Sequence, residues 1–178
     1  MAQGRCGASG RVRLQDPCGC RCSGRLGARF QEVSAVFKKL VVGVDFSEHS
    51  NRAVKAALKL ASSVGGTVVL VSVVPSRTEI VPSGTADDQF AGSIEHRLRD
   101  LAASLSESTG VTVDYGVEVN EDPAAELVRF VSTWGGDALI VGTTARTGLN
   151  RVLVGSVAER IFHNASVPVI VIGPNVVV

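Results

Sequence analysis

The chain has 178 residues, of which 45% are hydrophobic and 20% are charged, so we expect one globular domain with a substantial core. No apolar run reaches the roughly 18 residues of a membrane-spanning helix, which argues against a membrane partner and favours a cytoplasmic protein. The formal net charge is +1 and no basic stripe with interleaved aromatic residues occurs, so nucleic acid is not an expected partner either.

The beginning of the chain differs from the rest. Residues 1–37 carry a formal charge of +4 against −3 for the remainder, and they hold all four cysteines, Cys6, Cys18, Cys20 and Cys22. Their lack of apolar periodicity predicts a disordered basic head over residues 1–35. A metal site is the alternative, but no histidine or second cysteine pair completes a tetrahedron. We also hypothesise that translation starts at Val36, from a valine codon of the GTG type, which leaves residues 36–178 as the domain.

From Lys38 onward, short β-branched runs alternate with longer helical patterns, which is typical of a parallel sheet covered by helices. Each run is mostly Val, Ile or Leu, as expected of strands that are buried on both faces. We predict strands over residues 40–45, 67–74, 111–118, 138–142 and 167–172.

Two helices are predicted in the first half of the domain. An apolar stripe from Val54 to Val64 follows Ser47, which we expect to be its N-cap, and Gly65-Gly66 supplies a left-handed stop. A loop over residues 75–88 precedes the second helix. Its stripe comprises Phe90, Ile94, Leu98, Leu101 and Leu105, and it ends near Gly110.

Two further helices are predicted in the second half. The third has Asp122 as its cap and Pro123 at its first position, and it ends at Gly135-Gly136. Trp134 is expected to pack in the core. The fourth begins at the Gly155-Ser156 step, where Ser156 and Glu159 have the spacing of a capping box.

The order of these elements predicts an α/β fold with a single doubly wound, five-stranded parallel sheet of order 3-2-1-4-5 and helices on both faces. Ligands of such sheets bind beyond the carboxyl ends of the strands where the winding reverses, here between the first and fourth strands. Asp45-Phe46-Ser47 follows the first strand and Gly142-Thr143-Thr144 follows the fourth, so we expect both segments to line one crevice.

The glycine-punctuated segment 142–156 is typical of a phosphate-binding loop, because free backbone amides and the start of a helix favour an anion. Serine and threonine hydroxyls suit phosphate oxygens, whereas the carboxylate of Asp45 suits a ribose hydroxyl or a magnesium ion. Simple helix capping is the alternative role for Asp45 and Ser47.

At these residues the chain resembles the universal stress protein family. Residues 38–50 resemble the opening of its domain and residues 141–172 its close, so the resemblance spans residues 36–174 and implies an adenine nucleotide alpha hydrolase-like fold. The nucleotide-binding branch of the family carries G-x2-G-x9-G-[S/T]. Gly142, the nine-residue spacer 146–154 and the pair Gly155-Ser156 match this pattern, and Ala145 stands in place of the second glycine.

The resemblance implies that the chain binds ATP or another adenine nucleotide, with Mg²⁺ held indirectly by Asp45, and acts in stress response or signalling. Asp45 would then meet the ribose or the metal, Val73 the adenine, and Ser156 with Val157 the phosphates. The other implied binding residues are Phe46, Ser47, Gly142, Thr143, Thr144, Ala145, Arg146 and Gly155.

Ala145 is the departure from the pattern that bears on affinity. An alanine at positive φ costs about 1 kcal/mol, which weakens binding by less than tenfold unless its methyl group clashes with the phosphate. Arg146 can offset part of this cost by pairing with phosphate. We therefore expect nucleotide binding to survive the substitution.

No catalytic constellation accompanies the loop. The usual cofactor and hydrolase motifs are missing from the sequence, and His49, His96 and His163 are too scattered to form a triad, so we expect a binding protein with at most slow ATP hydrolysis. The alternative function is a dimeric interaction protein that binds no nucleotide. Either way, the apolar strand 167–172 and the tail 175–178 predict a homodimer formed through the last strand.

Overall fold

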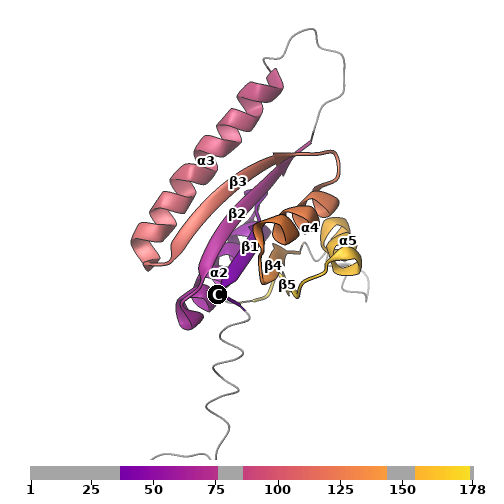
Figure 1. The fold of residues 1–178 in the computed structure, drawn as a ribbon. Helices are drawn as coiled ribbons and strands as arrows, with labels where there is room; N and C mark the ends of the chain where they lie inside the picture. The colour runs from indigo at the N-terminus through magenta and orange to yellow at the C-terminus, as the bar shows by residue number, and fades with distance from the viewer. Residues whose placement is uncertain (1–36, 76–85, 144–154, 177–178) are drawn as a thin grey trace, which may run out of the picture.

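The computed structural model describes residues 37–75, 86–143 and 155–176 (Figure 1). Strands and helices alternate along the chain, as the sequence predicts. The elements are β1 (Lys39–Gly43), α2 (Glu48–Val64), β2 (Thr67–Val74), α3 (Ala86–Thr109), β3 (Thr112–Val119), α4 (Pro123–Trp134), β4 (Ala138–Gly142), α5 (Ser156–Asn164) and β5 (Val169–Ile172).

The strands form one five-stranded parallel sheet of order β3-β2-β1-β4-β5, which confirms the predicted order (Figure 1). Strand β1 lies at the centre, since Val42 is in register with Leu70 of β2 on one side and with Ile140 of β4 on the other. The winding therefore reverses between β1 and β4, where the sequence places its candidate site.

Two hydrophobic cores lie on opposite faces of this sheet, because successive strand residues point to opposite sides. Leu40 and Val42 of β1 pack on one face with α2 and α3, whereas Val41 packs on the other face with α4 and α5. Trp134 is partly buried against the second core, as predicted. No helix of the described residues is both long and apolar enough to cross a membrane.

The predicted helix ends of α2 and α4 are confirmed. Ser47 caps α2 by accepting a hydrogen bond from Ser50 N, and α2 stops at Gly65 with φ 65°. Asp122 caps α4 by accepting from Ala124 N and Ala125 N, with Pro123 at the start of the helix. These side chains satisfy amide groups that have no partner inside the helix.

One predicted cap is wrong, and three predicted boundaries are wrong by two residues or more, while the bounds of β3 and the start of β1 differ by one residue. Strand β1 ends at Gly43 and not at residue 45, because the chain turns at Phe46, which has φ 61°. Strand β5 starts at Val169, after Pro168, which has no N–H to offer the sheet. Helix α3 begins at Ala86, inside the predicted loop. The capping box is also wrong, since Gly155 and not Ser156 is the N-cap of α5.

Candidate functional site

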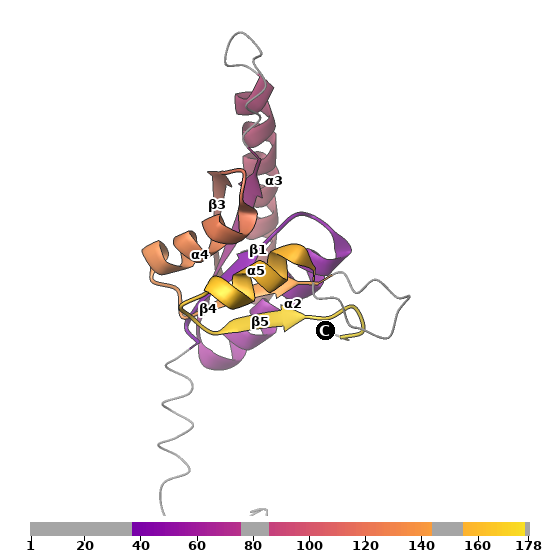
Figure 2. The ribbon, with the colours of Figure 1, turned by 90° about the vertical axis from the view of Figure 1, so that its right-hand side faces the viewer.

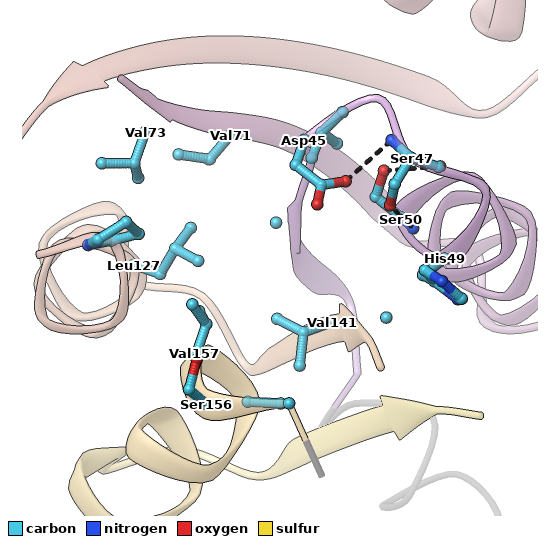
Figure 3. Close-up of a pocket in the computed structure, with 16 residues that line it drawn as sticks. Asp45, Ser47, His49, Ser50, Val71, Val73, Leu127, Val141, Ser156 and Val157 are labelled. Carbon is cyan, nitrogen blue, oxygen red and sulfur yellow. Dashed lines mark hydrogen bonds between the residues drawn. The ribbon is translucent and has the colours of Figure 1, made fainter. Parts of the chain in front are cut away.

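A cavity of about 290 Å³ opens at the carboxyl end of the sheet, between the ends of β1 and β4 (Figure 3). Of the residues predicted for the site, the cavity is lined by Asp45, Ser47, Val73, Gly142, Gly155, Ser156 and Val157. Phe46 and Thr143 lie outside this lining. Thr144, Ala145 and Arg146 fall outside the described residues, so their predicted roles stay predictions.

The turn between β1 and α2 holds the carboxylate of Asp45 at the cavity (Figure 3). Asp45 Oδ1 accepts a hydrogen bond from Ser47 N at 2.9 Å. Burial alone would raise the pKa of Asp45, but hydrogen bonds from Ser47 and Ser50 outweigh it and hold the pKa below its usual value. Asp45 is therefore charged at neutral pH, and a carboxylate can accept more hydrogen bonds than the turn supplies.

Phe46 contributes to this turn from outside the cavity. Its φ of 61° is costly for a residue with a large side chain. The ring packs against the core beneath α2 and α3, and the guanidinium of Arg97 lies 3.9 Å from the ring centroid. These contacts offset the backbone strain and fix the turn between Asp45 and Ser47.

Gly142, the last residue of β4, and Thr143, which follows it, both make close contacts within the protein. A Cβ on Gly142 would lie 2.3 Å from His49 O, so only glycine fits against the first turn of α2. Thr143 is buried, its N–H donates to Ile172 O, and its Oγ1 accepts from Gly155 N at 3.1 Å. Gly142 thus contacts α2, and Thr143 contacts β5 and the N-cap of α5.

The N-terminus of α5 lies across the cavity from Asp45 (Figure 3). Ser156, Val157 and Ala158 line the cavity, and Gly155 provides no capping side chain. The first bond inside the helix is donated by Glu159 N to Gly155 O. The amides before Glu159 thus have no acceptor within the helix, and together with the helix dipole they favour an anion at this end.

The remaining wall is apolar and comes from β2, α4 and β4. Val71, Val73, Leu127 and Val141 line it, with Pro123 at the start of α4 (Figure 3). Of these residues, only Val73 is predicted by the sequence. The others follow from the topology, since Val71 shares a face with Val73 and α4 starts at the same edge of the sheet at which β3 ends. His49 and Ser50, in the first turn of α2, also line the cavity.

Val73 adds two polar backbone groups to this apolar wall. Alternate residues of a strand present their N–H and C=O to opposite neighbours. Val71 O accepts from Val44 N and Val74 O accepts from Asn120 N, so the groups of Val73 point to the β1 side. The pairing of β1 with β2 ends at Gly43, and no other described strand pairs with Val73 on that side. Val73 can therefore bind one donor and one acceptor of a flat ligand.

A polar cluster ties together α4 and α5, the two helices whose N-termini flank the cavity. Asp122 forms an ion pair with Arg160 of α5. Glu126 is only 4% exposed, and it accepts hydrogen bonds from Asn120 and Arg129. The Arg129 guanidinium holds the pKa of Glu126 below its usual value, against the effect of burial, and Asn120 adds to this. The start of α4 is thereby fixed beside the cavity.

In the described part of the chain, no group of three or more His, Cys, Asp or Glu side chains is placed to hold a metal, and Asp45 is the one carboxylate that lines the cavity. A single carboxylate suits Mg²⁺ that is held mainly by phosphate oxygens and water. The donor set thus fits a metal that arrives with an anionic ligand.

A family model and a similar protein of known family both match most of this chain. The model of the universal stress protein family matches residues 37–173. The universal stress protein MJ0531 of Methanocaldococcus jannaschii is 30% identical over 151 residues, which cover 77% of this chain and 82% of that protein.

Solved structures share the fold. One, a universal stress protein in complex with cAMP, has a TM-score of 0.61 and 23% identity, and the match covers 77% of this chain and 97% of that one. Another, a universal stress protein from Archaeoglobus fulgidus in complex with dAMP, has a TM-score of 0.54 and 24% identity, with 77% and 98% covered.

Proposed function

The chain belongs to the universal stress protein family, and from this premise we propose that it binds an adenine nucleotide in the cavity beside Asp45. The observation that carries the proposal is the uncapped N-terminus of α5, which lines the same cavity as the charged carboxylate of Asp45. The cavity can thus accommodate a ligand that carries both an anionic group and several hydroxyl groups. The cAMP and dAMP complexes of similar proteins support this ligand class.

The chemistry of the walls assigns each part of the nucleotide to a place. The base would lie against Val71, Val73 and Leu127, with its polar edge on the free backbone groups of Val73. The ribose hydroxyls would donate to Asp45. The phosphates would accept from the amides of α5, with Arg146 of the loop as the predicted cation, and Mg²⁺ would neutralise phosphate charge next to Asp45.

We propose that the protein works by binding and acts in stress response or signalling through its liganded state. The lining offers Asp45 as a candidate base, but the hydroxyls beside it are engaged at the start of α2, where Ser47 Oγ accepts from Ser50 N and Ser50 Oγ donates to Ser47 O. Calorimetric titration of the purified chain with AMP and with ATP tests the proposal. We expect saturable binding of at least one of the two, and the absence of heat at millimolar concentrations of both would refute it.

A dimeric interaction protein without a nucleotide is the second candidate function. It is favoured by β5, which is an edge strand of the sheet that the described residues form (Figure 2), and by Phe162 on α5, which is 68% exposed. Unpaired strand edges and exposed aromatic residues are features of protein interfaces. We propose a homodimer formed through β5 under either function, because this edge is separate from the cavity.

A further inference from the structure

Thr143 joins three elements at the edge of the cavity without lining it. It follows β4 directly, and the residue is only 5% exposed. Its N–H donates to Ile172 O of β5 at 3.0 Å, and its Oγ1 accepts from Gly155 N at 3.1 Å. The end of β4 is therefore connected to the start of α5 through one hydroxyl group.

Gly155 occupies a position at which most helices carry a side-chain oxygen. Serine, threonine, aspartate or asparagine at an N-cap accepts from the second or third amide of the helix. Gly155 has φ −55° and ψ 149°, a conformation open to any residue, so backbone strain does not require glycine here. What glycine provides is the absence of an oxygen that would compete for these amides.

We propose that Thr143 is a positioning residue for the ligand: its hydroxyl fixes Gly155 in place of a capping side chain, so that the first amides of α5 stay free for a phosphate group. This inference rests on the proposed function and adds to it. Thr143 is a structural anchor in this account, whereas the sequence analysis expected its hydroxyl to meet phosphate directly.

The test compares Thr143→Val, which keeps the shape and loses the acceptor, with Thr143→Ser, which keeps the hydroxyl. Affinity for AMP is measured by calorimetry at a temperature at which each variant is folded, and unfolding is followed separately. We expect Thr143→Val to bind AMP about tenfold more weakly and Thr143→Ser to restore most of the affinity. Thr67→Val is the matched control, because Thr67 begins β2 at the amino ends of the strands, away from the cavity, and its side chain makes a long hydrogen bond of 3.4 Å to Lys38 O.

The outcomes separate the two proposals. If the wild-type chain binds neither AMP nor ATP, the proposed function fails and the role of Thr143 fails with it. If it binds only ATP, the same variants are compared with ATP. If the wild-type chain binds AMP and folded Thr143→Val binds it equally well, with only a lower unfolding temperature, Thr143 is merely structural and the inference is overturned.

A second pair of variants decides the question if Thr143→Val does not fold. Gly155→Ser and Gly155→Ala add the same Cβ, and only serine adds a capping oxygen. We expect Gly155→Ser to unfold at a higher temperature than Gly155→Ala and to bind AMP about tenfold more weakly than it. Equal affinities of the two variants would contradict the inference.

Discussion

Gly142 shows how one residue can satisfy a family motif for a reason other than the ligand. The motif implies a glycine that lets the backbone approach phosphate, but in this fold the glycine lets β4 approach α2. A Cβ at this position would lie 2.3 Å from His49 O and 2.9 Å from Ser50 N, both of which are backbone atoms. Backbone cannot move aside as the tip of a flexible side chain can, so the contact sets how closely the two sides of the cavity meet.

We expect Gly142→Ala to lower the free energy of unfolding by about 3 kcal/mol, as at other overpacked sites. This loss is expected in the absence of nucleotide, because the clash is with backbone atoms of the protein. Urea unfolding monitored by Trp134 fluorescence measures this change. Gly92→Ala is the matched control, because Gly92 lies within α3, nothing lies within 4 Å of the added Cβ, and alanine favours helix. A Gly142→Ala protein as stable as the control would show that the close packing of β4 on α2 is not needed.

Helix α4 contributes its apolar side to the cavity and its polar side to a network around Glu126. Asn120 donates to Glu126 Oε2 at 2.8 Å, Arg129 donates to Glu126 Oε1 at 2.8 Å, and Asn120 Oδ1 accepts from Asp122 N at 2.9 Å. The buried carboxylate therefore orients Asn120, which in turn accepts from the backbone N–H of the cap residue Asp122. Loss of this charge would loosen the start of the helix, where Pro123 and Leu127 line the cavity.

The lowered pKa of Glu126 makes this contribution dependent on pH. The folded protein binds this proton less tightly than the unfolded chain, whose glutamate has a pKa near 4.5, so the stabilisation is present above pH 4.5 and is lost as the pH falls through the lower, folded value. We expect Glu126→Gln to lose about 1 to 2 kcal/mol at pH 7 and to differ less from the wild type in acid.

Chemical unfolding across this pH range measures the difference, with Glu107→Gln as the control for an exposed glutamate on α3. A stability gap between wild type and Glu126→Gln that stays constant down to pH 3 would argue against a role for the charge of Glu126. If Glu107→Gln also lost stability at pH 7 and less in acid, the effect would be a general one of removing negative charge.

The proposed homodimer depends on the position of β5 at the edge of the described sheet. Leu139 N donates to Pro168 O and Thr143 N donates to Ile172 O, so alternate residues of β5 face β4 and Val171 presents its N–H outward. We expect the wild-type chain to have the mass of two chains in light scattering and Val171→Pro to be a monomer, since proline removes the outward donor. Val171→Ala controls for the lost side chain, and a monomeric wild type would contradict the proposal.

Sequence patterns predicted the sheet order, the caps at Ser47 and Asp122, and a crevice between the ends of β1 and β4, because each depends on local propensity or on the handedness of connections. The roles of Gly142 and Thr143 depend on contacts with α2, β5 and α5, which no local pattern contains. The capping box failed for a related reason. Ser156 and Glu159 have the right spacing, but Thr143 binds Gly155, which is the N-cap, so Ser156 is already the first residue of the helix.

The central claim is that a nucleotide occupies the cavity beside Asp45, and titration of Asp45→Asn with AMP tests it most directly. The asparagine keeps the size of the side chain and removes the charged acceptor for the ribose hydroxyls. We expect affinity at least about tenfold below that of the wild type, whereas Asp114→Asn on β3, at the far edge of the sheet, binds as the wild type does. Equal affinities of wild type and Asp45→Asn would contradict the account.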